Sequence, residues 1–213
     1  CVRATGPPGR SARRRLTHLV GRDPSGLSED EVARAVVESV AENTSDAVVA
    51  PLLWGGLAGV PGLLAYRAVN TLDAMIGHRS PRYERFGKAA ARLDDVVNLL
   101  PARLAAALAT VLGPDRPGAL RAWRRDAAGH PSPNAGAVEA AFAGALGIRL
   151  GGTNVYGERI EHRPTLGDGR PVKPGDIAPA TRLARRVGLG AALIAAGIAL
   201  LRRARQPTPS PTK

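Results

Sequence analysis

The chain of 213 residues is long enough to bury a core in one large domain or in two small ones. Hydrophobic residues reach 44% and aromatic residues only 3%, so small and aliphatic side chains supply the apolar mass, which favours close helix–helix contacts. The net charge of +12 comes mainly from Arg, as a GC-rich genome would also produce, so we expect no nucleic-acid partner. The one cysteine, Cys1, excludes an intrachain disulfide.

Residues 1–22 form a basic segment with six Arg and no acidic residue, and they lack the apolar core of a signal peptide. Beside a membrane segment, such a block favours the cytoplasmic face. Ser28 is suited to cap the first helix, because three acidic residues follow it where the helix dipole favours anions.

The run 47–66 contains 20 residues without a charge, about 30 Å as a helix, which is the thickness of a bilayer core. It predicts a membrane span, although two prolines and four glycines interrupt it and a buried hairpin of a soluble α-protein is the alternative. Gly55 and Gly59 form a GxxxG pair, which favours close helix packing.

Two weaker apolar segments follow, at 96–113 and 187–201. The first contains Arg103, which is expensive at mid-membrane depth, and the second has 15 residues between Arg pairs that can snorkel. Residues 114–182 are expected to be loops apart from a short helix over 135–148, and 202–213 a disordered tail. The fold class expected for residues 23–201 is therefore all-α: a multi-pass integral membrane protein whose polar loops carry the site.

Carboxylates gather near the ends of these segments. Asp94 and Asp95 are followed one helical turn later by Asn98, a pattern typical of a magnesium site, or else of a capped helix start. Asn70 and Asp73 lie just beyond the first apolar run. Glu38, Glu42 and Asp46 recur at every fourth residue before it, as one face of a helix. Such carboxylates suit a metal–nucleotide or an ammonium substrate, or they form a solvated face.

The loop 126–136 contains two X-Pro turns with His130 and Asn134 on either side, and a lone histidine is more often structural than catalytic. The glycine-rich stretch 151–157 is neither a dinucleotide fingerprint nor a P-loop. The sequence also lacks HExxH, GxSxG and CxxC, which argues against zincin proteases, α/β-hydrolases and thiol redox enzymes.

Taken together, several stretches resemble the adenosylcobinamide-phosphate synthase family (CobD/CbiB) of cobalamin biosynthesis. The resemblance runs from about residue 12 to residue 201 and rests on GRDPSGL, VESVAENTSDAVVAPL, YRAVNTLDAMIGHRSPRYERFGKAAARLDDVVNLLPARL, HPSPNAG, EAAFAGALGIRLGG and RPTLGDG. The family implies an N-terminal portion with further membrane helices before residue 1. The sequence departs from the family's usual pattern at Pro24-Ser25, where relatives more often carry a Thr-Glu pair, and at Ser45-Asp46-Ala47, where they more often carry Asp-Gly.

The resemblance implies a ligase that uses ATP and Mg²⁺ to join a carboxylate of adenosylcobyric acid, a corrinoid, to (R)-1-amino-2-propanol or its O-phosphate. It also implies a multi-pass protein of the cell membrane with its active site facing the cytoplasm. The positions that match the family's motifs then receive the following expected roles: metal binding by Asp94 and Asp95; catalysis by Glu38, Glu42, Asp46 and His130; and substrate binding by Arg67, Asn70, Asp73, Arg79, Arg92, Asn98 and Asn134.

Two other classes stay open at this point. One is a Mg²⁺-dependent membrane prenyl- or alcohol-phosphotransferase, which also uses acidic clusters at a bilayer surface. The other is a non-catalytic membrane remnant.

Overall fold

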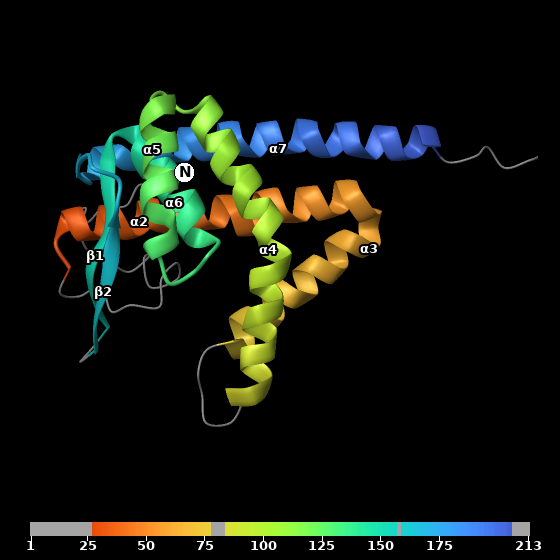
Figure 1. Cartoon of the computed structure of the whole chain (residues 1–213), viewed down its shortest axis with the longest axis horizontal. Coiled ribbons are helices and arrows are strands. Elements are labelled where there is room, and N and C mark those ends of the chain that lie inside the picture. Colours follow the sequence, from red (N-terminus) through yellow and green to blue (C-terminus); the bar gives the residue numbers. More distant parts are fainter. Residues whose placement is uncertain (1–26, 78–83, 157–158, 206–213) are drawn as a thin grey trace, which may run out of the picture.

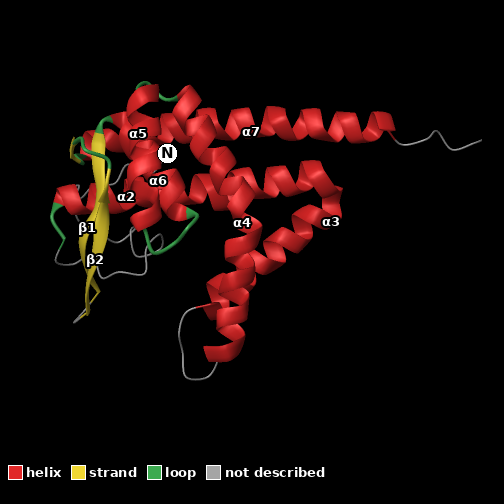
Figure 2. Ribbon diagram, viewed as in Figure 1, coloured by secondary structure: helices red, strands yellow, loops and turns green. Residues whose placement is uncertain are grey.

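The computed structural model describes residues 27–77, 84–156 and 159–205, most of which are helical (Figure 2). The first helix among the described residues, α2 (Glu29–Asn43), begins at a capping box. The Glu31 carboxylate accepts the Ser28 N–H at 2.8 Å, and the Ser28 hydroxyl accepts the Glu31 N–H at 3.3 Å. The predicted cap at Ser28 is thus confirmed.

From α2 the chain continues through a π-helix, η1 (Thr44–Val49), into α3 (Ala50–Leu72). Gly59 interrupts α3 with φ 69° and ψ −158°, a conformation that residues with a Cβ essentially never adopt. The chain turns back at this residue, and α3 is a hairpin of two helical limbs rather than one straight span (Figure 1). Pro61 fits near the start of the second limb, because a helix needs no N–H bond there.

The last helix, α7 (Ile177–Arg205), lies beside the first limb of α3 (Figure 1). A Cβ placed on Gly56 would lie 3.0 Å from the main-chain oxygen of Ala195, so the two helices approach each other closely at Gly56. The two glycines of the predicted GxxxG pair do not make this contact: Gly55 faces Leu63 within the hairpin, and Gly59 forms the turn. At the end of α7, Arg202 donates to the Gly56 carbonyl at 3.2 Å.

A short π-helix, η2 (Asp73–Gly77), ends the hairpin, and α4 (Glu84–Leu112) then leads to α5 (Arg116–Asp126) and α6 (Ala135–Leu146). Alanine builds most of the core where α4, α5, α6 and α7 meet, and Phe142 is its largest fully buried side chain. Small side chains allow the close helix contacts that the composition indicates.

A small sheet packs at one end of the helices, in the region expected to be loop (Figure 2). Strand β1 (Ile148–Tyr156) pairs antiparallel with β2 (Arg159–Leu166) and parallel with β3 (Arg170–Pro171). Two 3₁₀ turns, η3 (Ala127–Gly129) and η4 (Pro174–Asp176), complete the fold. The helix expected over 135–148 is confirmed as α6, whereas α5 and the sheet were not expected.

Three helical segments among the described residues are long and apolar enough to cross a membrane: Glu29–Gly77, Arg85–Leu112 and Pro174–Arg205. Large apolar side chains are exposed on all three, including Leu64, Leu100 and Leu193 with 60%, 56% and 76% of their surface accessible. The expected all-α membrane fold is thus confirmed. The expected basic segment 1–22 and most of the tail 202–213 lie outside the described residues, and α7 extends to Arg205.

Candidate functional site

The α3 hairpin brings together two positions that are 20 residues apart. The hydroxyl of Tyr66, at the end of the second limb, lies 2.8 Å from the main-chain oxygen of Asp46 in η1. A straight helix of 20 residues would separate them by about 30 Å, so this contact depends on the turn at Gly59. A π-helix such as η1 is rare and is often found at functional sites.

A chain of hydrogen bonds continues from Tyr66 to Asp94 on α4. The Tyr66 hydroxyl also lies 3.0 Å from Asn98 Oδ1, and Asn98 Nδ2 donates to Asp94 Oδ2 at 2.9 Å. Asn70 Nδ2 donates to the other oxygen, Oδ1, at 3.3 Å. Asn98 and Tyr66 are buried. The side-chain amides of Asn70 on α3 and Asn98 on α4 hold the Asp94 carboxylate between the two helices. Predicted residues from three sequence stretches therefore meet here.

Further carboxylates lie near Asp46. The negative charges of Glu42, Asp94 and Asp73 all lie close enough to Asp46 to act on it electrostatically. Asp73 begins η2, and its carboxylate fills the space that a side chain at Gly77 would need. We call Asp46, Asp73 and Asp94, with Glu42, the acidic cluster. Like charges in one place favour a bound cation or protons.

The acidic cluster suits Mg²⁺ in the type of its ligand atoms. Among the described residues, no three His, Cys, Asp or Glu side chains converge as a complete metal-binding set. Mg²⁺ commonly takes only one or two carboxylates and completes its shell with waters and substrate phosphates. Asp94, whose two oxygens are oriented by Asn70 and Asn98, is the best-oriented ligand for such a shared ion.

Asp95, the other predicted metal ligand, is linked to a second polar group. Its main-chain oxygen accepts a 2.8 Å hydrogen bond from Asn134 Nδ2, and Asn134 Oδ1 accepts one of 2.8 Å from Arg103 Nη1. Asp94 and Asp95 are neighbours on a helix, so their side chains leave it about 100° apart. The loop before α6 thus docks onto α4 beside the acidic cluster.

His130 belongs to the same loop but faces into the protein. Its Nδ1 accepts the Ser132 N–H at 3.1 Å, and its Nε2 lies 3.9 Å from the Glu139 carboxylate in α6. Both side chains are buried. His130 therefore belongs to a buried polar group with Glu139, and its expected catalytic role stays a prediction.

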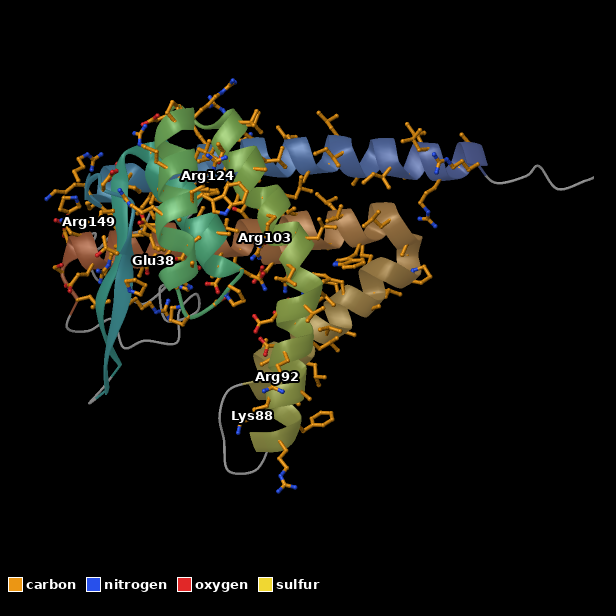
Figure 3. All side chains as sticks on the ribbon, viewed as in Figure 1. Glu38, Lys88, Arg92, Arg103, Arg124 and Arg149 are labelled. Carbon is orange, nitrogen blue, oxygen red and sulfur yellow. The ribbon has the colours of Figure 1, made fainter. Side chains whose placement is uncertain are left out.

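Glu38 also lies apart from the acidic cluster, although it shares a helix face with Glu42 in the sequence pattern. It is buried at 4% exposure and accepts the Gly151 N–H of β1 at 2.9 Å (Figure 3 shows its place beside the sheet). Glu42 is exposed, and η1 changes the helical repeat before Asp46. The three carboxylates expected on one helix face therefore lie in two places: Glu38 beside the sheet, and Glu42 and Asp46 in the acidic cluster.

The predicted arginines differ in position. Arg67 is exposed and lies 3.4 Å from Asn70 Oδ1, Arg92 is exposed on α4, and Arg79 lies outside the described residues. The sequence interpretation missed Tyr66 and Arg103 as site residues. A signal existed for each: a phenol at the end of a charge-free run, and a cation inside an apolar segment.

A family model described as CobD/Cbib protein matches residues 5–184. A cobalamin biosynthesis protein CobD of Mycobacterium tuberculosis is 58% identical over 197 residues, which cover 91% of this chain and 63% of that protein. The CobD proteins of Rhodobacter capsulatus and Geobacter metallireducens are 50% and 55% identical, over 89% and 78% of this chain.

The chain covers 61% and 52% of the latter two proteins, so it spans little more than half to about three fifths of these relatives. No solved structure matches the chain.

Proposed function

Because this chain belongs to the CobD/CbiB protein family, we propose that it acts in cobalamin biosynthesis as an amide-forming ligase of the cell membrane. The substrates are the free carboxylate of adenosylcobyric acid, ATP, and (R)-1-amino-2-propanol or its O-phosphate. The relatives, which are cobalamin biosynthesis proteins, support the pathway. The three apolar helical segments support the membrane location, and the active site faces the cytoplasm, where ATP and the corrinoid are found.

The observation that carries the proposal is the acidic cluster at Asp94. It joins the hairpin of α3 to α4 through Tyr66, Asn98 and Asn70, and it gathers negative charge where the reaction needs to hold cationic partners. Asp94, with Asp73 or Glu42, would hold Mg²⁺, which would supply charge neutralisation to the phosphates of ATP.

The reaction proceeds by activation of the carboxylate, which is a poor electrophile at neutral pH. A carboxylate oxygen attacks the γ-phosphorus of ATP, the bond to ADP breaks, and an acyl phosphate forms. The amine nitrogen then attacks the acyl carbon, and inorganic phosphate leaves. The amine gives up a proton, for which Asp46 is the base in this proposal, while Asn70 and Asn98 keep the Asp94 carboxylate in place.

The proposal is tested with the purified chain in lipid nanodiscs, supplied with adenosylcobyric acid, aminopropanol or its phosphate, ATP and Mg²⁺. We expect a corrinoid whose mass rises by the amine minus water, with one ADP formed per amide. Carboxylate labelled with ¹⁸O should deliver one label to inorganic phosphate. Turnover of a prenyl diphosphate without ATP, and no corrinoid product, would contradict the proposal.

A further inference from the structure

Arg103 stands out among the residues that the proposed reaction leaves unused. It lies within the apolar segment Arg85–Leu112, where a cation is expensive unless it has a partner and a function. Its hydrogen bond to Asn134 Oδ1 satisfies one of the five N–H donors of a guanidinium. Asn134 is neutral, and Arg103 makes no ion pair with any residue that the structure describes.

Asn134 is held in a single orientation. It is 6% exposed, and its Nδ2 donates to the Asp95 carbonyl at 2.8 Å. Because a carbonyl only accepts hydrogen bonds, the amide oxygen of Asn134 is the atom that faces Arg103. The guanidinium is therefore fixed at one end by a rigid neutral group, and its positive charge remains for another partner.

The position of Arg103 relates it to the acidic cluster. Arg103 follows Asp95 by eight residues, about 12 Å along the helix axis, and helical side chains lean toward the N-terminus, which here is toward Asp95. The Asn134 carboxamide bridges the guanidinium to the Asp95 main chain. Figure 3 shows Arg103 on α4 beyond Arg92 and Lys88. Asn134 thus connects the cationic group to the main chain of Asp95, the residue after Asp94 of the acidic cluster.

We infer that Arg103, held by Asn134, forms an oxyanion-binding subsite that takes a carboxylate or phosphate oxygen of a substrate. The inference rests on the proposed function, in which two anionic substrates meet at one site. Arg is suited to this because its planar fork matches both carboxylate and phosphate. The acidic cluster repels such anions, and a positive side chain near it would offset this repulsion in addition to the Mg²⁺ proposed at Asp94.

The test measures binding to the chain in nanodiscs, without turnover, for wild type, Arg103→Gln and Arg103→Lys. Gln keeps an N–H donor for Asn134 but removes the charge, whereas Lys keeps the charge. Three probes are used: adenosylcobyric acid, adenosylcobinamide, in which the same carboxylate is a neutral amide, and a non-hydrolysable ATP analogue with Mg²⁺. Arg116→Gln, which removes an exposed Arg from α5, is the matched control.

We expect Arg103→Gln to bind one anionic probe about ten- to a hundredfold more weakly than wild type, with Arg103→Lys in between and Arg116→Gln unchanged. Loss for adenosylcobyric acid but not for adenosylcobinamide identifies the corrinoid carboxylate, and loss for the ATP analogue identifies a phosphate.

Unchanged binding of both anionic probes, or equal loss for the neutral amide, would overturn the inference and leave Arg103 as an anchor of the loop. Failure of the wild-type chain to bind any corrinoid counts instead against the proposed function.

Discussion

Replacing Gly59 by alanine tests the turn on which the site depends. Gly59 has φ 69° and ψ −158°, and forcing a residue with a Cβ into this region costs about 1–3 kcal/mol. The variant must bear this strain or straighten α3, and a straight helix would move Tyr66 about 30 Å from Asp46. We therefore expect a lower midpoint of thermal unfolding in detergent and a loss of corrinoid amidation larger than the loss of folded protein.

The matched control is Gly197→Ala on α7. No atom lies within 4 Å of a Cβ built there, and alanine favours a helix over glycine by up to about 1 kcal/mol. We expect this control to keep or raise the midpoint. Wild-type stability and activity in Gly59→Ala would refute the hairpin as the device that assembles the site.

Three further outcomes are expected. Tyr66→Phe should lower the free energy of unfolding by about 1–2 kcal/mol in chemical denaturation and slow turnover, because the one O–H that lies between the Asp46 main-chain oxygen and Asn98 Oδ1 is lost; equal stability would contradict this. Gly56→Val should cost about 1–3 kcal/mol, because a Cβ would already lie 3.0–3.3 Å from Ala195 and valine adds two methyl groups; an unchanged thermal midpoint would count against the α3–α7 contact. The Arg125 guanidinium, with the Gly167 N–H, holds the pKa of the Asp126 carboxyl below its usual range. The stability contributed by Asp126 should thus be present above about pH 3.9 and disappear as pH falls through its folded-state pKa. Asp126→Asn should remove this pH dependence, and identical acid-unfolding curves would contradict it.

Local signals in the sequence predicted much of the helical framework. The Ser28 cap is a short-range pattern, and the structure confirms it. Long apolar segments mark α3, α4 and α7, because an apolar surface of that length needs lipid or other helices around it. Asp46 borders the first apolar run, and Asp94 belongs to a carboxylate pair followed one turn later by Asn98. The structure places these two carboxylates near each other.

Features that depend on distant contacts were harder to predict. The prolines and glycines in the 47–66 run fit either a kinked helix or a hairpin. The turn at Gly59 and the packing of Gly56 against Ala195, a residue far along the chain, show that it is a hairpin. The π-helix η1 changes the helical repeat, so Asp46 does not lie on the same helix face as Glu38. Glu38 instead accepts a hydrogen bond from the Gly151 N–H. The β1–β2 pair was hidden because glycines and prolines interrupt the alternation of its strands.

The most direct test of the central claim compares the rate of ATP-dependent amide formation by wild type and by Asp94→Asn. The mass of the corrinoid and the release of ADP are measured in the same sample. Asn retains the size of the side chain, and it can keep a hydrogen bond with Asn70 or Asn98, but it removes the negative charge. We expect the variant to insert and unfold like wild type while amide formation falls by at least a hundredfold, about 2.7 kcal/mol in the barrier. Amide formation at the wild-type rate by folded Asp94→Asn would contradict the account.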